Sequence, residues 1–284
     1  MPDFPIVDAH VHLYDPAAVS YPWMAGEPRL NAPHGPAEYA RATEGVEVER
    51  MVFVEVDAAA GAYLDEVRWV AEAARGEPRL QGMVASVPLE KGAACAADIA
   101  AFAAVPIARA VRRLIQPHLD RPGWCLRPEF VAGVKLLAAH NLKFEICIYH
   151  PQLADAIELV RRCPEVGFIL DHIGKPGIRD GIREPWWSRM RELARLPNVV
   201  CKVSGAVTEA DHRTWTYDQV APYVSHAIDC FGFGRVVFGG DWPVVNLAAG
   251  FRQWVDMLDR IVAGTADADA RRLYRDNAVA WYRL

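Results

Sequence analysis

Short apolar runs alternate with segments of helical spacing along the whole chain. Runs rich in β-branched and aromatic residues that end at glycine, proline or a polar residue predict strands. Eight such runs are present: IVDAHVH (6–12), MVFVEV (51–56), LQGMVASVP (80–88), ARAVRRLIQ (108–116), LKFEICIYH (142–150), VGFILDH (166–172), VVCKVSG (199–205) and RVVFGGDW (235–242). Between them, apolar residues recur every three or four positions, most clearly at 62–76, 95–105, 153–164 and 186–197. These spacings predict helices.

A strand followed by a helix, repeated eight times, predicts the α/β fold class and a closed parallel (β/α)8 barrel of the TIM type. We expect a single domain over residues 1–284. An open doubly wound sheet is the main alternative, but no G-x-G-x-x-G follows the first strand. The last segment, 267–284, predicts a closing helix.

Two long segments interrupt the repeat. Residues 14–40 contain five prolines and are too irregular for a helix. The second segment, 174–187, follows the sixth predicted strand. Because the active face of such a barrel is built from the loops after the strands, we expect both segments to lie over its mouth.

Composition narrows the function classes. The 284 residues are 52% hydrophobic, and 31 basic and 36 acidic residues give a net charge of −5. No basic block is present that would neutralise phosphates or an anionic membrane, so nucleic acid and membrane partners are not expected. No signal peptide or membrane-spanning run is found, so the cytoplasm is the expected location. The six scattered cysteines lack a C-x-x-C pair and indicate buried small residues.

Polar residues gather where the predicted strands end. In a barrel these ends meet at one face, where catalytic groups lie. The residues found there are His10, His12, Glu55, Gln116, His150, His172, Ser204 and Asp241. Four of the nine histidines and a carboxylate are thus predicted to converge, although each histidine could instead be a hydrogen-bonded core residue, and Asp241 a helix N-cap.

Further residues are candidates for substrate contact. Lys175 could neutralise a substrate oxygen, and Trp23 and Trp242 could line a pocket. Strand alternation lets at most one of the adjacent Arg112 and Arg113 face inward, and Arg113 is taken as the candidate. Lys202 shares a face of the seventh strand with Ser204 and could lie in the barrel interior.

Histidines with a carboxylate suit a divalent metal such as zinc, and the same set can transfer protons without one. A bridged two-metal centre would need lysine or glutamate on the fourth strand, where ARAVRRLIQ offers arginine and glutamine. The residues therefore predict at most one metal, on His10, His12 and Asp241 with help from His150 or His172.

The motifs IVDAHVHLYDP, YPWM, FVEVDA, FEICIYHPQL, LDHIGKP, CKVSG and VFGGDWP resemble the amidohydrolase superfamily. Within it they are similar to the sugar-lactonase branch, which includes L-fuconolactonase, L-rhamnonolactonase and 2-pyrone-4,6-dicarboxylate lactonase. The resemblance implies hydrolysis of a small-molecule sugar lactone, with L-fuconolactone the first choice. It implies Asp241 as general base, and it implies that His10, His12, His150 and His172 polarise the carbonyl, hold the water or bind a metal. Because the pyrone lactonase works without a divalent cation, zinc is expected to bind without being required.

Two alternatives to a lactonase stay open. One is a metal-dependent decarboxylase on the same barrel, which would need tightly bound zinc and an acidic aromatic substrate. The other is a non-catalytic barrel whose histidines only bind a metal or a partner.

Overall fold

Eight parallel strands form one sheet in a computed structural model that describes residues 2–284. The strands pair in chain order from β1 to β8. They span β1 Ile6–Val11, β2 Val48–Val54, β3 Leu80–Ala85, β4 Ala108–Arg112, β5 Lys143–Ile146, β6 Phe168–Leu170, β7 Val199–Val203 and β8 Val236–Phe238. The sheet closes where Val11 bridges Trp242 in parallel and the His12 N–H donates to the Trp242 carbonyl oxygen at 2.8 Å. The predicted (β/α)8 barrel is confirmed.

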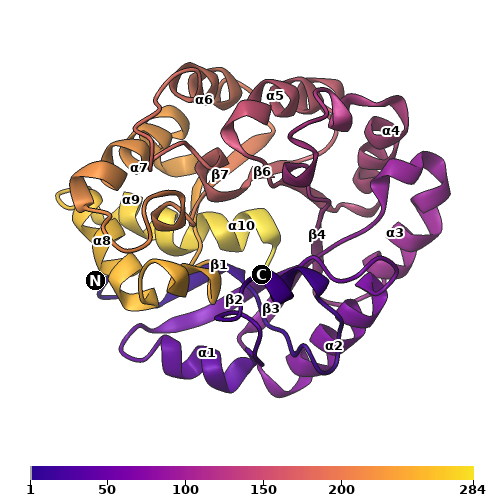
Figure 1. The fold of residues 1–284 in the computed structure, drawn as a ribbon, viewed down its shortest axis with the longest axis horizontal. Coiled ribbons are helices and arrows are strands. Elements are labelled where there is room, and N and C mark those ends of the chain that lie inside the picture. The colour runs from indigo at the N-terminus through magenta and orange to yellow at the C-terminus, as the bar shows by residue number, and fades with distance from the viewer. Residues whose placement is uncertain (1) are drawn as a thin grey trace.

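Helices surround this ring (Figure 1). They span α1 Pro36–Ala42, α2 Tyr63–Gly76, α3 Ala96–Ala103, α4 Pro128–Leu136, α5 Leu153–Arg162, α6 Trp186–Ala194, α7 Tyr217–Phe231, α8 Phe251–Ile261, α9 Asp267–Arg271 and α10 Asn277–Tyr282. The four helices predicted from spacing correspond to α2, α3, α5 and α6. Their apolar faces pack against the outer side of the sheet in one large buried cluster.

The barrel interior is filled by a separate cluster of small and branched side chains. This cluster consists of Val7, Ala9, Val52, Val54, Val84, Ala110, Ile169, Val200 and Val237, with Ala278 and Tyr282 of α10. In Figure 1, α10 lies in yellow within the outline of the ring. The residues after α10 contact the amino ends of the strands: Arg50 donates to the Leu284 carbonyl oxygen at 2.9 Å, and Arg283 donates to the Asn141 carbonyl oxygen, just before β5, at 2.8 Å. The C-terminal segment therefore closes this end of the barrel and leaves the other end as the mouth.

Two segments and the bounds of the strands differ from the sequence prediction. The proline-rich stretch 14–40 contains a 3-10 turn at Pro22–Gly26 and the start of α1 at Pro36. Proline is well tolerated in the first turn of a helix, so the proline count alone was misleading there. The closing helix is split into α9 and α10 by a π-type turn at Arg272–Asp276. The predicted strands extend one to several residues past the observed carboxyl ends, because their last residues leave the sheet to form the mouth, and the second, predicted at 51–56, begins three residues earlier, at Val48.

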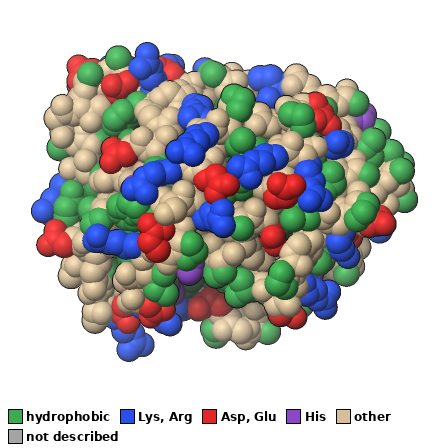
Figure 2. Space-filling model, turned by 90° about the horizontal axis from the view of Figure 1, so that it is seen from above, with side chains coloured by type: hydrophobic (Ala, Val, Ile, Leu, Met, Phe, Trp, Pro, Cys, Tyr) green, Lys and Arg blue, Asp and Glu red, His purple; other side chains and the backbone are tan. Residues whose placement is uncertain are grey.

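Among residues 2–284, no helix combines the length and apolarity needed to cross a bilayer. Figure 2 shows basic and acidic side chains interspersed on the face that it draws. Neither the positively nor the negatively charged side chains form a continuous patch on that face.

Candidate active site

His10 and His12 both face the barrel interior because β1 contains a bulge. Asp8 pairs with Met51 of β2 and Val11 pairs with Phe53, so three steps on β1 oppose two on β2. A bulge of this kind changes which side chains face inward. His10 Nε2 lies 3.2 Å from His12 Nε2, and His12 Nδ1 donates to the carbonyl oxygen of Val54 at 2.8 Å. This bond leaves the Nε2 of a neutral His12 as an acceptor facing the mouth.

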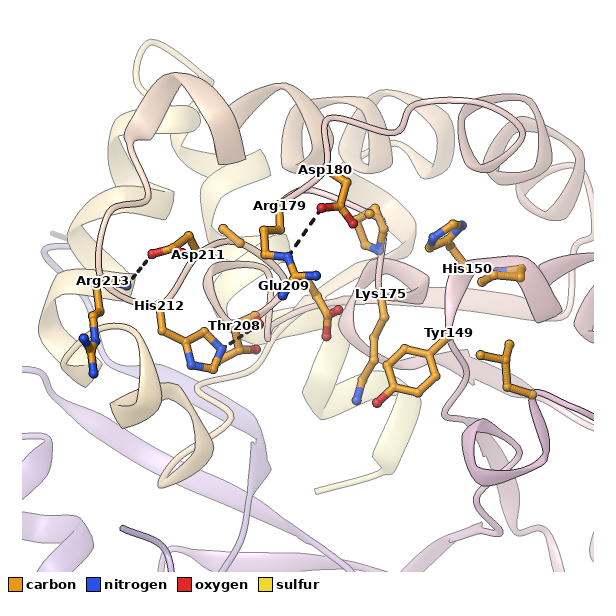
Figure 3. A pocket seen from close by; sticks show the side chains of 15 residues that line it. Tyr149, His150, Lys175, Arg179, Asp180, Thr208, Glu209, Asp211, His212 and Arg213 are labelled. Atoms are coloured by element: carbon orange, nitrogen blue, oxygen red, sulfur yellow. Dashed lines mark hydrogen bonds and ion pairs between the residues drawn. The ribbon is translucent and has the colours of Figure 1, made fainter. Parts of the chain in front are cut away.

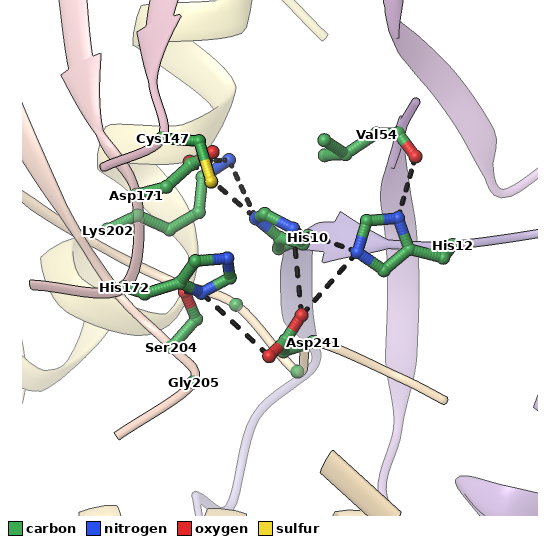
Figure 4. A network of polar contacts seen from close by, with 12 residues as sticks. His10, His12, Val54, Cys147, Asp171, His172, Lys202, Ser204, Gly205 and Asp241 are labelled. Carbon is green, nitrogen blue, oxygen red and sulfur yellow. Dashed lines mark hydrogen bonds and ion pairs between the residues drawn. The ribbon is translucent and has the colours of Figure 1, made fainter. Parts of the chain in front are cut away.

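Asp241 meets this pair from the opposite edge of the sheet. Its Oδ1 lies 3.5 Å from His12 Nε2 and 3.7 Å from His10 Nε2 (Figure 4). Its backbone has the left-handed φ of +55°. Its N–H donates to the carbonyl oxygen of His10 at 2.8 Å. The base candidate and the histidine pair are therefore held on one backbone seam.

The two glycines before Asp241 allow this close approach. A Cβ on Gly240 would lie 2.3 Å from the Phe251 ring and 2.4 Å from an Asp8 carboxylate oxygen. A Cβ on Gly239 would lie 2.8 Å from that of His10. The motif VFGGDW is therefore explained by packing at the point where β8 closes on β1.

His172 approaches Asp241 from the turn after β6. Its Nδ1 lies 2.9 Å from the Ser204 hydroxyl and 3.9 Å from Asp241 Oδ2. Gly205, with φ of +59°, packs on the same ring, and a Cβ there would lie 2.5 Å from His172 Nδ1. Ser204 is therefore a hydrogen-bond partner of His172 and lies behind it, with no exposed surface.

The turn that carries His172 is a run of left-handed residues. His172, Ile173 and Lys175 have φ of +52°, +48° and +45°, and Gly174 between them has φ of +73°. Each non-glycine residue in this region costs about 1–2 kcal/mol. Buried Ile173 and the bond from Trp186 Nε1 to its carbonyl oxygen, 2.9 Å, hold the turn in place. The strained backbone presents both His172 and Lys175 to the mouth, as strain at functional sites commonly does.

Beneath the histidines lies a layer of buried charges. Arg112 of β4 donates to Glu55 at 2.6 Å and lies 3.3 Å from Asp171. Lys202 of β7 lies 2.8 Å from Glu145 and 3.0 Å from Asp171. The lysine also lies 3.2 Å from Nδ1 of His10, which supports the ring from below. Asp171 and Glu145 were not predicted as site residues, although Asp171 follows the inward-facing Ile169 by two residues and so shares its face.

The surroundings of the mouth lower the pKa of Asp241, of His172 and of His10, for different reasons. Burial alone would raise the pKa of Asp241, but His172, His12 and His10 outweigh it and hold that pKa below its ordinary range. Burial lowers the pKa of His172 to about 4, against the weaker opposing effect of Asp241. Burial and then the ammonium of Lys202 lower the pKa of His10. At neutral pH the site thus combines the ionised carboxylate of Asp241 with the neutral imidazoles of His10 and His172.

A cavity of about 300 Å³ opens above these groups. Six predicted site residues line it: His12, Trp23, Gln116, His172, Lys175 and Asp241. Tyr14, Asp57, Arg112, Cys147 and Thr208 also contribute to its wall and were not predicted there. The volume lies at the lower end of the range for small-molecule sites. His10 and Glu55 lie just behind this wall and are buried.

Arg112 is the inward-facing arginine of β4, and Arg113, the predicted one, is not. Arg113 pairs with Glu90, with Nε to Oε2 at 2.9 Å, and both side chains are partly exposed. One residue along a strand reverses the face, and a sequence without a known register does not show which face is inside.

His150 and Trp242 also lie outside the cavity. His150 lines a separate, more open groove of about 860 Å³, which shares Lys175 and Thr208 with the cavity. The Lys175 ammonium lies 5.3 Å from the centre of the Tyr149 ring, and Figure 3 draws it apart from His150. Trp242 is 2% exposed and packs edge-on against Tyr39. Both lie near the ends of their predicted strands, but the chain turns after β5 and β8 and directs them elsewhere.

The donor set fits one metal. The Nε2 atoms of His10 and His12 and Oδ1 of Asp241 lie 3.2–3.7 Å from one another, and ligands at zinc bond lengths stand about 3.3 Å apart in a tetrahedral site. His10, His172 and Asp241 also form a group with metal-ligating spacing. However, the Lys202 ammonium can only donate to His10 Nδ1, which places the proton of a neutral His10 on Nε2, where a metal would bind. The geometry suits a metal, and the lysine opposes tight binding.

Comparison with known proteins gives a match over nearly the entire chain. A family model described as Amidohydrolase matches residues 7–284. An L-fucono-1,5-lactonase of Burkholderia multivorans is 30% identical over 295 residues, which cover 98% of this chain and 96% of the relative. One of Burkholderia ambifaria is 33% identical over 224 residues, which cover 78% and 76%. A crystal structure of a Burkholderia multivorans amidohydrolase with bound zinc is 28% identical, with a TM-score of 0.89 over 99% of this chain and 100% of that one. With these matches over the same barrel and mouth, the chain belongs to the amidohydrolase family.

Proposed function

We propose that this chain hydrolyses a sugar lactone to the aldonic acid, with L-fuconolactone as the first candidate substrate. Two relatives at 30% and 33% identity are named L-fucono-1,5-lactonase. An L-rhamnono-gamma-lactonase of Scheffersomyces stipitis is 22% identical over the full length of both chains. The names agree on the lactone class, so they support the class more strongly than any one sugar.

The ionised carboxylate of Asp241 is the observation that carries the proposal. It lies in the wall of a cavity of about 300 Å³, next to the Nε2 of His12 and within 3.9 Å of His172. A carboxylate in this position can take a proton from a water that occupies the cavity. Trp23, Gln116 and Asp57 offer an apolar ring and polar groups to a hydroxyl-rich ring.

In the proposed reaction, Asp241 removes a proton from water while the water oxygen bonds to the lactone carbonyl carbon. The tetrahedral intermediate then re-forms the carbonyl, and the bond from that carbon to the ring oxygen breaks. Asp241 returns its proton to the ring oxygen as it leaves. His12 accepts a hydrogen bond from the water at Nε2 and orients it, while His172, held by Ser204, keeps the carboxylate in place. The products are an aldonate and a released proton.

We further propose that the site takes one zinc ion without depending on it. His10, His12 and Asp241 would hold it, and the zinc-bound relative of the same fold supports this assignment. A bound zinc would supply Lewis-acid polarisation of the carbonyl. The contact between Lys202 and His10 favours weak binding, so we expect chelator-treated protein to retain lactone hydrolysis and to bind added zinc weakly in calorimetry. Complete loss of activity on chelation, restored by zinc, would contradict this part of the proposal.

The test is a pH-indicator screen of 1,4- and 1,5-sugar lactones, because ring opening releases acid. Wild type and Asp241→Asn are assayed together, with Asp180→Asn, an exposed carboxylate, as the matched control. We expect Asp241→Asn to lower kcat/KM by about 100- to 10,000-fold and Asp180→Asn to leave it unchanged. A wild type that opens no lactone overturns the proposal, and release of carbon dioxide from an aromatic acid would instead indicate the decarboxylase.

A further inference from the structure

Lys175 is a partly buried cation at the cavity that lacks an ion pair. The other two cations of the site are neutralised, Arg112 by Glu55 and Lys202 by Glu145 and Asp171. Among residues 2–284, no carboxylate oxygen lies within the 4.0 Å of an ion pair from Lys175 Nζ. Charges withdrawn from water are normally paired, because an unpaired one is costly. An unpaired ammonium that lines a cavity therefore indicates an anionic or developing negative group in the bound molecule.

The position of this ammonium is fixed by three contacts. Its Nζ donates to Gln116 Oε1 at 2.7 Å and lies 5.3 Å from the centre of the Tyr149 ring. The backbone N–H of Lys175 donates to the carbonyl oxygen of His172 at 2.9 Å within the left-handed turn. Gln116 accepts only one of the three N–H bonds of the ammonium. At least one remains for a ligand, so the group is held in place and still has a free donor.

Lys175 and Asp241 are complementary to the charge changes of an ester hydrolysis. Both line the same cavity, where the carboxylate gains a proton as water attacks. The negative charge that the carboxylate gives up in taking this proton appears on the carbonyl oxygen, and a preorganised cation at that place stabilises it. The neutralised Arg112 and Lys202 supply no net positive charge for this purpose.

Building on the proposed function, we infer that Lys175 binds the carbonyl oxygen of the lactone and is the main stabiliser of the oxyanion. The carbonyl electron pair moves to that oxygen as the water oxygen bonds to the carbon, and Lys175 donates an N–H to it. The pair returns when the bond to the ring oxygen breaks, and Asp241 gives its proton to the ring oxygen. Lys175 stays protonated throughout and ends in contact with the carboxylate of the aldonate.

The test compares Lys175→Met, Lys175→Arg and the control Arg179→Met on a lactone that the wild type opens. Arg179 is an exposed cation of the neighbouring groove, paired with Asp180. We expect Lys175→Met to lower kcat by about 100- to 1,000-fold with a smaller change in KM. We expect Lys175→Arg to recover part of the loss and Arg179→Met to behave as wild type.

A second measurement separates this role from a structural one. Inhibition by the aldonate product should be lost in Lys175→Met, whereas inhibition by the uncharged alditol of the same sugar should persist. Loss of both inhibitions together with a lower Tm would indicate a structural role and overturn the inference. A Lys175→Met enzyme with kcat near wild type overturns it while the proposed function stands. A wild type that opens no lactone overturns both.

Discussion

The backbone N–H of Asp241 donates to the carbonyl oxygen of His10 at 2.8 Å, across the seam where the barrel closes. On the same seam His12 donates to Trp242. The first and last strands therefore carry the two halves of the site, and the bonds that close the barrel also set the distance between carboxylate and imidazole. Substitutions that disturb this seam are expected to affect folding and activity together, whereas those in the mouth can separate the two.

Gly205→Ala should displace His172. The new Cβ would lie 2.5 Å from His172 Nδ1, in a residue whose φ of +59° already disfavours a side chain. Since the ring cannot stay against Ser204 and Asp241, we expect lactone hydrolysis to fall about 10-fold or more and Tm to drop. Gly181→Ala, also at positive φ but with open space around it, is the matched control. Equal activity of the two variants would show that the position of His172 does not matter.

Lys202→Met should strongly destabilise the fold. It leaves the carboxylates of Glu145 and Asp171 buried without their ammonium partner, a change that costs about 3–5 kcal/mol. Chemical denaturation measures the free energy of unfolding. The control is Lys135→Met, which removes an exposed lysine 3.9 Å from Glu165. It should change the free energy of unfolding by less than about 1 kcal/mol. Adding Glu145→Gln to Lys202→Met should restore part of the loss, and a double variant no more stable than the single would argue against unpaired charge as the cause.

Arg112→Met and Arg113→Met should differ, although the residues are adjacent. Arg112 joins Glu55 to Asp171 under the cavity, so its loss should cost about 3–5 kcal/mol and reduce activity. Arg113 pairs with Glu90 at a partly exposed position, and its loss should cost about 1 kcal/mol or less without affecting hydrolysis. Unfolding curves and initial rates of both variants check this. A loss of activity in Arg113→Met alone would restore the assignment made from sequence.

His172 should make the protein less stable as pH falls from about 6.5 to about 4. Its folded pKa of about 4 lies below the ordinary 6.5, so in this window the unfolded chain binds a proton that the folded chain does not. The difference amounts to roughly 3 kcal/mol by the low end of the window. Unfolding free energies of wild type and His172→Gln at pH 7.5 and 4.5 should converge or cross as pH falls. The exposed His140→Gln should track wild type, and a constant gap for His172→Gln would disprove the linkage.

The local pattern of the sequence was enough to predict the eight strands, their parallel order and six of the fourteen residues that line the cavity. Apolar alternation and turn residues are properties of neighbouring positions, and the closed barrel is the arrangement that buries such repeats. Asp241, His10, His12 and His172 could be named because strand ends converge on one face.

Only the tertiary structure decided which of these residues meet, because that depends on strand register and on contacts between distant positions. Three features follow from pairings that no local pattern encodes. They are the bulge in β1, the inward orientation of Arg112 rather than Arg113, and the position of His150 in the groove instead of the cavity. The same holds for the neutralised layer of Arg112, Asp171 and Lys202, and for the lack of an ion pair at Lys175. A charge is paired or unpaired only with respect to neighbours that folding brings to it.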